Sequence, residues 1–120
     1  MIVLKLPIPP SINAAYANQR KGWGGRGRYK TAQYKTWERE ADALLLAQRG
    51  WAQVTDARPY ALHITLPSTM RGDITNRIKV LEDYLVSRAI TPDDRHNHET
   101  LIRKSSAVDC CEVTIKGLTG

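Results

Sequence analysis

Three aspartates and one lysine in the second half of the chain have the types and spacing that phosphate chemistry requires. Asp73 follows a predicted strand and precedes a predicted helix, Lys79 lies six residues further on, and Asp93 and Asp94 follow that helix. Grouped carboxylates raise one another's pKa unless a cation relieves the repulsion, and carboxylate oxygens are ligands that suit Mg²⁺. These aspartates are therefore candidate metal ligands, and the lysine could stabilise charge on a phosphate.

Each of these residues also has a plain structural explanation. Asp73 would be favourable at a helix N-terminus through the helix dipole, and Asp93 and Asp94 would suit a solvated turn. Lys79 and Asp83 are spaced to form an exposed i,i+4 ion pair worth about 0.2–0.5 kcal/mol. The spacing alone leaves both explanations open.

A second candidate site is the basic segment from Arg20 to Lys30. It contains five cations, four glycines and no acidic residue, so we expect a mobile loop whose side chains contact phosphates. The alternative is an ordinary solvated loop. The candidate DNA contacts are Arg20, Lys21, Arg26, Arg28 and Lys30, together with Arg71 near the carboxylates.

The whole chain has the size and charge of one basic domain. It has 120 residues, and its 18 Lys and Arg against 12 Asp and Glu give a formal net charge of +6. Domains of ~100–150 residues are the commonest, so we expect a single domain over residues 1–120. The charge favours an anionic partner but does not separate nucleic acid from an acidic protein or membrane.

The apolar and cysteine content points away from membranes and disulfides. The longest aliphatic run is Leu44-Leu45-Leu46, far short of the ~20 apolar residues that a membrane span requires. Cys110 and Cys111 are adjacent, a spacing at which a disulfide is rare and strained. We therefore expect a cytoplasmic protein with no membrane contact.

Apolar periodicity predicts the elements that position the candidate residues. Alternation predicts strands over 2–6, 60–66, 99–104 and 111–116, the last two joined as a hairpin through 105–109. Helical spacing predicts one helix that is capped by Thr31 and ends at Gly50, and another over 76–88. The order strand, helix, strand, helix, strand, strand predicts an α/β domain with a mixed sheet and helices packed on it.

These elements give an expectation for the carboxylates. Asp73 comes after the second strand and Asp94 leads toward the third. We expect these two strands to be neighbours and to bring both side chains to one edge of the sheet, where α/β proteins usually bind ligands.

The motifs together resemble the RusA family of Holliday junction resolvases. The resemblance begins with Leu6-Pro7-Ile8-Pro9-Pro10-Ser11-Ile12-Asn13 and the Gly/Arg-rich segment. It continues with Asp73-x-x-Asn76-x-x-Lys79-x-x-x-Asp83 and ends with Asp93-Asp94, so it covers nearly the whole chain.

The resemblance implies a metal-dependent endonuclease that acts as a homodimer on four-way DNA junctions in recombination and repair. Mg²⁺ would be the usual metal, with Mn²⁺ as an alternative. Asp73 and Asp94 match metal-binding aspartates, with Asp93 as a further candidate, and Lys79 matches the catalytic lysine. Asn76 is then a candidate DNA contact, and Thr75, Asp83 and Asn13 are candidate supporting residues.

One position departs from the family pattern. The family motif reads Asp-x-Asp-Asn, whereas this chain reads Asp73-Ile74-Thr75-Asn76, so a hydroxyl stands where a second carboxylate is expected. A neutral hydroxyl binds Mg²⁺ less well than a carboxylate. Thr75 therefore favours one alternative, a catalytically weak or inactive junction-binding protein. A third, blander possibility is a small basic RNA- or duplex-binding domain without branch selectivity.

Overall fold

A mixed sheet of four strands forms the centre of the structure, a computed structural model that describes residues 2–18, 28–48, 59–92 and 94–118. The strand order is β1-β6-β4-β5, with β4 parallel to β5 and antiparallel to β6, and β6 antiparallel to β1. The predicted α/β class with a mixed sheet is thereby confirmed. The strands are β1 (Ile2–Leu6), β4 (Tyr60–Pro67), β5 (Asn97–Ser105) and β6 (Cys111–Gly117).

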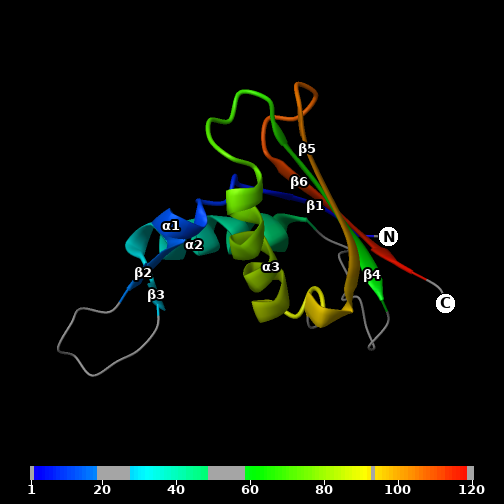
Figure 1. Cartoon of the computed structure of the whole chain (residues 1–120), viewed down its shortest axis with the longest axis horizontal. Coiled ribbons are helices and arrows are strands. Elements are labelled where there is room, and N and C mark those ends of the chain that lie inside the picture. Colours follow the sequence, from blue (N-terminus) through cyan, green and yellow to red (C-terminus); the bar gives the residue numbers. More distant parts are fainter. Residues whose placement is uncertain (1, 19–27, 49–58, 93, 119–120) are drawn as a thin grey trace.

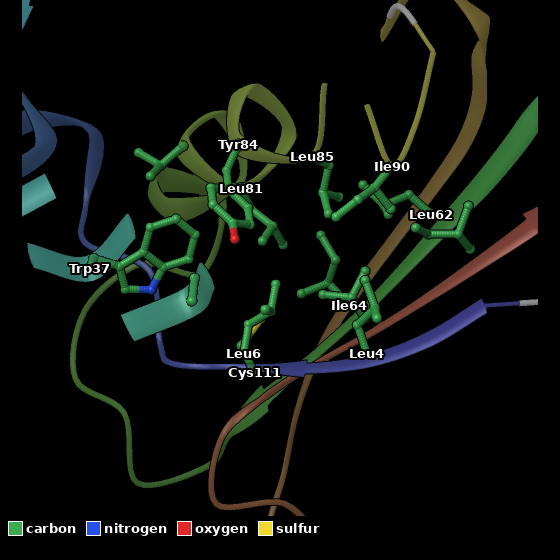
Figure 2. Packing of buried hydrophobic residues seen from close by; sticks show 14 of the residues in the cluster. Leu4, Leu6, Trp37, Leu62, Ile64, Leu81, Tyr84, Leu85, Ile90 and Cys111 are labelled. Carbon is green, nitrogen blue, oxygen red and sulfur yellow. The ribbon is translucent and has the colours of Figure 1, made fainter. Parts of the chain in front are cut away.

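One face of this sheet forms the hydrophobic core. Successive side chains of a strand point to opposite faces, so every second residue of the central strands is apolar and buried. Figure 2 shows Leu4, Leu62 and Ile64 facing side chains from the helices, including Trp37 and Leu85. The helices therefore cover a single face, and the loops at the sheet ends are left to carry polar groups.

Helix α2 (Ala32–Ala47) begins where the sequence predicts. The side chain of Thr31 caps it by accepting a hydrogen bond from the Tyr34 backbone N–H at 3.2 Å. Its buried face includes Tyr34 and Trp37, and the Trp37 indole donates to the Pro7 carbonyl at 2.9 Å. The predicted stop at Gly50 lies outside the described residues.

Helix α3 (Ile78–Ser87) carries the chain from the end of β4 to the start of β5. Its buried residues include Leu81 and Leu85, as the predicted spacing requires. The helix ends in a Schellman motif, in which Ala89 donates to the Val86 carbonyl and Ile90 donates to the Leu85 carbonyl. Ala89 occupies the left-handed position of this motif with a φ of 56°, a position that glycine usually fills.

Two parts of the predicted fold are wrong. Strands β5 and β6 exist but do not pair as a hairpin, because β4 lies between them. Cys111, Val113 and Ile115 of β6 are fully buried, which suits a central strand, whereas most residues of β5 are exposed, as at an edge. The segment 28–30, predicted as loop, forms a short strand β3 (Arg28–Lys30) paired with β2 (Tyr16–Asn18).

Short elements connect these parts. Helix α1 (Ile12–Ala15) precedes β2, and 3₁₀ turns η1 (Thr75–Arg77) and η2 (Asp94–His96) lead into α3 and β5 (Figure 1). Within the described residues, no helix combines the length and apolarity needed to cross a membrane.

Candidate functional site

Asp73 lies on the loop between β4 and α3, and Thr75 fixes its carboxylate. The backbone N–H and the hydroxyl of Thr75 both donate to Asp73 Oδ1, at 3.0 and 2.8 Å. These bonds, the hydroxyl bond above all, hold the pKa of Asp73 below its usual range, and nearby Lys104 lowers it further. Asp73 is therefore an exposed anion at neutral pH.

The structure gives Thr75 a contact that an aspartate could not make in the same form. The Thr75 hydroxyl donates a hydrogen bond, whereas an ionised carboxylate can only accept. Residue 75 of this chain therefore orients the carboxylate of Asp73 instead of supplying a second negative ligand. This is the local consequence of the departure from the Asp-x-Asp-Asn pattern.

Lys104, at the end of β5, was not among the predicted site residues. Its Nζ donates to the backbone carbonyls of Met70 and Gly72 at 3.0 and 3.3 Å, which ties the loop before Asp73 to the sheet. The alternation of β5 places Lys104 on the same face as Ile102, which packs against the core. A lysine at such a position needs polar partners, and that is the sequence signal that could have revealed it.

Arg77, in η1, ties the same loop to the N-terminal proline segment (residues 7–10). Its guanidinium donates to the Pro9 carbonyl at 2.6 Å and to the Arg71 carbonyl at 3.2 Å, while its Nε is buried and has no hydrogen-bond partner among the residues that the structure describes. The Asp73 loop is thus anchored both to β5 and to the N-terminal proline segment. Both Lys104 and Arg77 donate to backbone carbonyls, so neither forms a hydrogen bond with the Asp73 carboxylate in these contacts.

Lys79 and Asp83 form an ion pair on one side of α3. Their side chains are 3.1 Å apart and 53% and 35% exposed, and the Tyr16 hydroxyl donates to Asp83 Oδ2 at 2.9 Å. Burial, followed by hydrogen bonding, raises the pKa of Tyr16, so it remains a neutral donor. With Ile12, these residues line a shallow hollow of about 240 Å³ at the base of the β2–β3 hairpin.

The structure does not bring Asp94 to Asp73. Tyr60 pairs with Asn97 and Pro67 pairs with Ser105 in the parallel β4–β5 register. The loop with Asp73 therefore lies at the far end of these strands from Asp94, which begins η2, and α3 spans the distance between them (Figure 1). The expectation that both side chains meet at one edge of the sheet is wrong for a single chain.

The remaining predicted residues are spread over several elements. Asn13 is exposed on α1, Asn76 is half-buried in η1, and Arg71 is exposed beside the Asp73 loop. The Lys30 ammonium is 3.1 Å from Glu38 and 5.2 Å from the centre of the Tyr34 ring, so it faces α2. Outside the described parts lie Arg20, Lys21, Arg26 and Asp93 and the side chains of Arg28 and Asp94.

The donor set of one chain does not make a Mg²⁺ site in the described residues. No group of three or more His, Cys, Asp or Glu side chains there is arranged to hold a metal ion. Asp73 offers one carboxylate, one oxygen of which already accepts two hydrogen bonds, and its charge is partly balanced by Lys104. Mg²⁺ takes six oxygen ligands, of which waters and substrate phosphates usually supply several beside one or two carboxylates, so Asp73 alone provides only one part of such a site.

Comparison with known proteins assigns the chain to a family. None of the curated proteins compared with the chain matches it. The family model of the endodeoxyribonuclease RusA matches residues 7–116, which include the proline segment, the Asp73 loop, Lys79 and Lys104. The chain therefore belongs to the RusA endodeoxyribonuclease family.

Proposed function

We propose that the chain is a metal-dependent endonuclease that resolves four-way DNA junctions by paired nicks in recombination and repair. The observation that carries the proposal is the Asp73 loop, in which an ionised carboxylate faces solvent while two cations hold the backbone beneath it. Such a pre-fixed carboxylate can hold a metal ion against a scissile phosphate. The proposed setting is the cytoplasm.

The residues of the chain have distinct parts in this reaction. Asp73 holds the metal, Mg²⁺ or Mn²⁺, which when bound supplies Lewis-acid activation of the phosphate and of water. Thr75 keeps the Asp73 carboxylate in one orientation and ionised. Asp83 keeps the Lys79 ammonium at the start of α3, where its half-exposed charge can stabilise a phosphate oxygen.

Two chains are needed if Asp73 and Asp94 act on one metal. The eight residues of β4 separate the two ends of the sheet by about 25 Å, at ~3.3 Å per residue. A symmetric dimer can remove this separation by placing Asp73 of one chain beside Asp94 of the partner subunit. We therefore propose a homodimer with two such shared sites, one for each of the two nicks.

The phosphate-binding part of the proposal uses the cationic segment Arg20–Lys30 and Arg71. Strands β2 and β3, which precede and follow residues 19–27, are held against α3 and α2, because Tyr16 bonds to Asp83 and Lys30 to Glu38. The strands before and after residues 19–27 are therefore fixed in position. The formal net charge of +6 supplies the long-range attraction to DNA.

Incubation with a synthetic four-way junction and with linear duplex, in Mg²⁺, Mn²⁺ or EDTA, tests the activity. We expect paired nicks in the junction that require metal and disappear in Asp73→Asn. Tight junction binding without a cut in either metal would favour the inactive junction-binding protein that Thr75 suggests. Equal affinity for both DNAs would favour a basic domain without branch selectivity.

Mixing two inactive variants tests the shared site. Asp73→Asn and Asp94→Asn each remove one ligand from both sites of their own dimers. A mixed dimer keeps one intact site when the ligands come from different chains, so a mixture should recover about one quarter of the wild-type nicking, as single nicks. If both ligands come from the same chain, no mixed dimer contains an intact site and the mixture stays inactive.

A further inference from the structure

We propose that two copies of the chain pair through the outer edge of β5, antiparallel, with Leu101 of both chains on the two-fold axis. The inference rests on the homodimer of the proposed function and identifies the surface that forms it. Three observations carry it: an open strand edge, a self-complementary charge pattern and the positions of Asp73 and Asp94.

The first observation is that the two edges of the sheet differ. β5 has nine residues and, within the described chain, pairs only with β4. The opposite edge is the five-residue strand β1, where the Gln48 side chain accepts from the Lys5 N–H at 2.6 Å and donates to the Lys5 carbonyl at 2.7 Å. A long unpaired edge is a template for another strand, and β5 is the edge without such a cover among the described residues.

The second observation is the order of side chains on the face of β5 that lies away from the helices. Glu99, Leu101 and Arg103 alternate onto this face, and Leu101 is 48% exposed. Antiparallel pairing centred on Leu101 places Glu99 opposite Arg103 of the partner subunit, twice by symmetry, around a central pair of leucines. Opposite charges in such cross-strand pairs are stabilising, and like charges are destabilising.

The alternative registers on this face lack that match. Centring the pair on Glu99 would oppose two glutamates, and centring it on Arg103 would oppose two arginines. Contacts within the chain already orient both residues, since Glu99 lies 2.8 Å from the His63 ring and the Arg103 Nε donates to Thr65 at 3.3 Å. The face therefore selects Leu101 as the centre.

The third observation concerns Asp73 and Asp94, which lie at opposite ends of strands β4 and β5 in one chain. Lys104 ties the Asp73 loop to the last residues of β5, whereas Asp94 lies just before its first residue. An antiparallel two-fold places the first residues of one strand beside the last residues of the other. It therefore moves Asp94 of the partner subunit toward the end of the sheet that carries Asp73.

Charge reversal with mixing tests the interface. Sedimentation should give a wild-type dimer, and Arg103→Glu and Glu99→Arg should each raise the dimer dissociation constant at least tenfold, since each faces like charges in its own dimer. An equimolar mixture of the two variants restores both opposite-charge pairs and should restore the dimer. A misfolded variant could not be rescued in this way, and circular dichroism of each variant provides a second check.

The matched control uses the two exposed apolar residues at the sheet edges. Val3 on β1 is 50% exposed, close to the exposure of Leu101. Leu101→Lys should weaken the dimer at least tenfold, whereas Val3→Lys should leave it unchanged.

The outcomes separate the interface from the proposed function. A wild-type monomer, or a dimer that Arg103→Glu leaves intact, overturns the β5 interface. In the second case the shared site still stands if the mixture of Asp73→Asn and Asp94→Asn recovers nicking. A dimer that dissociates and is rescued as described, but cuts no junction in either metal, supports the interface and overturns the nuclease proposal alone.

Discussion

Two charged regions of this molecule are built on opposite plans. Between α2 and α3, Arg88 binds Asp42 through Nε and Nη2 at 2.8 and 3.1 Å and reaches Glu38 at 3.4 Å, and the Tyr84 hydroxyl donates to Asp42 at 2.7 Å. Here side chains of opposite charge satisfy one another. On the Asp73 loop, by contrast, the neighbouring cations bind backbone carbonyls.

The difference separates charges that stabilise the fold from a charge that is left available to a ligand. Arg88 also lies over the Tyr84 ring at 4.9 Å, so its cation is satisfied within the fold. Lys104 and Arg77 shape the loop and leave the carboxylate of Asp73 open to solvent. Substitutions in the first region should therefore affect stability, and substitutions in the second should affect activity.

The largest expected effect is that of Asp73→Asn on cutting. Loss of the metal-binding charge should reduce junction cleavage by about 10³-fold or more, as loss of a group that stabilises the transition state does. The melting temperature should stay within about 2 °C, because exposed substitutions change stability by about 0.5 kcal/mol or less. Gel assays and thermal melts check both, with Asp109→Asn as an exposed acidic control that keeps full activity. Cleavage at the wild-type rate in Asp73→Asn would contradict the site.

Arg88→Met should do the reverse. Removing the guanidinium leaves Asp42 and the buried Glu38 without their shared partner, at a cost of about 2 kcal/mol after allowance for the partial exposure of the pair. The melting temperature should fall by roughly 8 °C. The rate of junction cleavage, measured at a temperature about 20 °C under the melting temperature of the variant, should be unchanged.

Arg88→Lys provides the conservative comparison. A lysine keeps the charge but not the two-pronged geometry toward Asp42, so the loss should be smaller than in Arg88→Met. Equal losses in both variants would show that the geometry contributes nothing.

The same ion pair predicts how stability depends on pH. Hydrogen bonding from Arg88 lowers the pKa of Asp42 in the folded protein. A carboxyl whose pKa is lowered by folding stabilises the protein above its unfolded pKa of about 3.9, and this contribution disappears as the pH falls through the folded value. Denaturant unfolding between pH 6 and 2.5 should therefore show the gap between wild type and Arg88→Met closing below about pH 4. A gap that stays constant would contradict the role of Asp42.

Local patterns in the sequence were sufficient for much of the fold. The Thr31 cap and the apolar spacing after it locate α2, and alternation locates all four sheet strands, because these signals depend on near neighbours in the chain. The loop with Asp73 also follows from local order, between a strand and a helix. The Thr75 bond to Asp73 required only that a hydroxyl stand two residues after a carboxylate.

The order of strands in the sheet and the separation of Asp73 from Asp94 depend on contacts between residues that are distant in the sequence, so local patterns could not predict them. Insertion of β6 between β1 and β4 depends on which strand buries most apolar surface, as Val113 and Ile115 show by their complete burial. A crossover helix such as α3 returns the chain to the end where β4 began, so Asp94, just before β5, lies at the other end of the strands from Asp73. Lys104 was missed because its partners are backbone carbonyls, which residue types do not identify; its place on the face of Ile102 showed only that it needs polar partners.

Thr75→Asp sharpens the comparison within the second region. A carboxylate at position 75 adds a metal ligand and removes the hydroxyl bond to Asp73, so the Mg²⁺ concentration for half-maximal cutting should fall by about tenfold. Thr75→Asn, which removes the hydroxyl without adding charge, is the control and should produce no such gain. An unchanged Mg²⁺ requirement in Thr75→Asp would mean that the metal is held away from residue 75.

Ala89→Gly makes the smallest change and tests whether the packed region can still be improved. Ala89 lies in the left-handed position after α3, with a φ of 56°, directly beside Arg88. Glycine avoids the steric cost of a Cβ there, and after its greater loss of chain entropy a gain of about 0.5–1 kcal/mol remains. The melting temperature should rise by roughly 2–4 °C with no change in cutting. Ala107→Gly, at an exposed turn, serves as the control. Equal effects in both variants would mean that the φ of Ala89 carries no strain. A gain in stability confined to Ala89→Gly, with cutting unchanged, would show that stability and activity are set in separate regions.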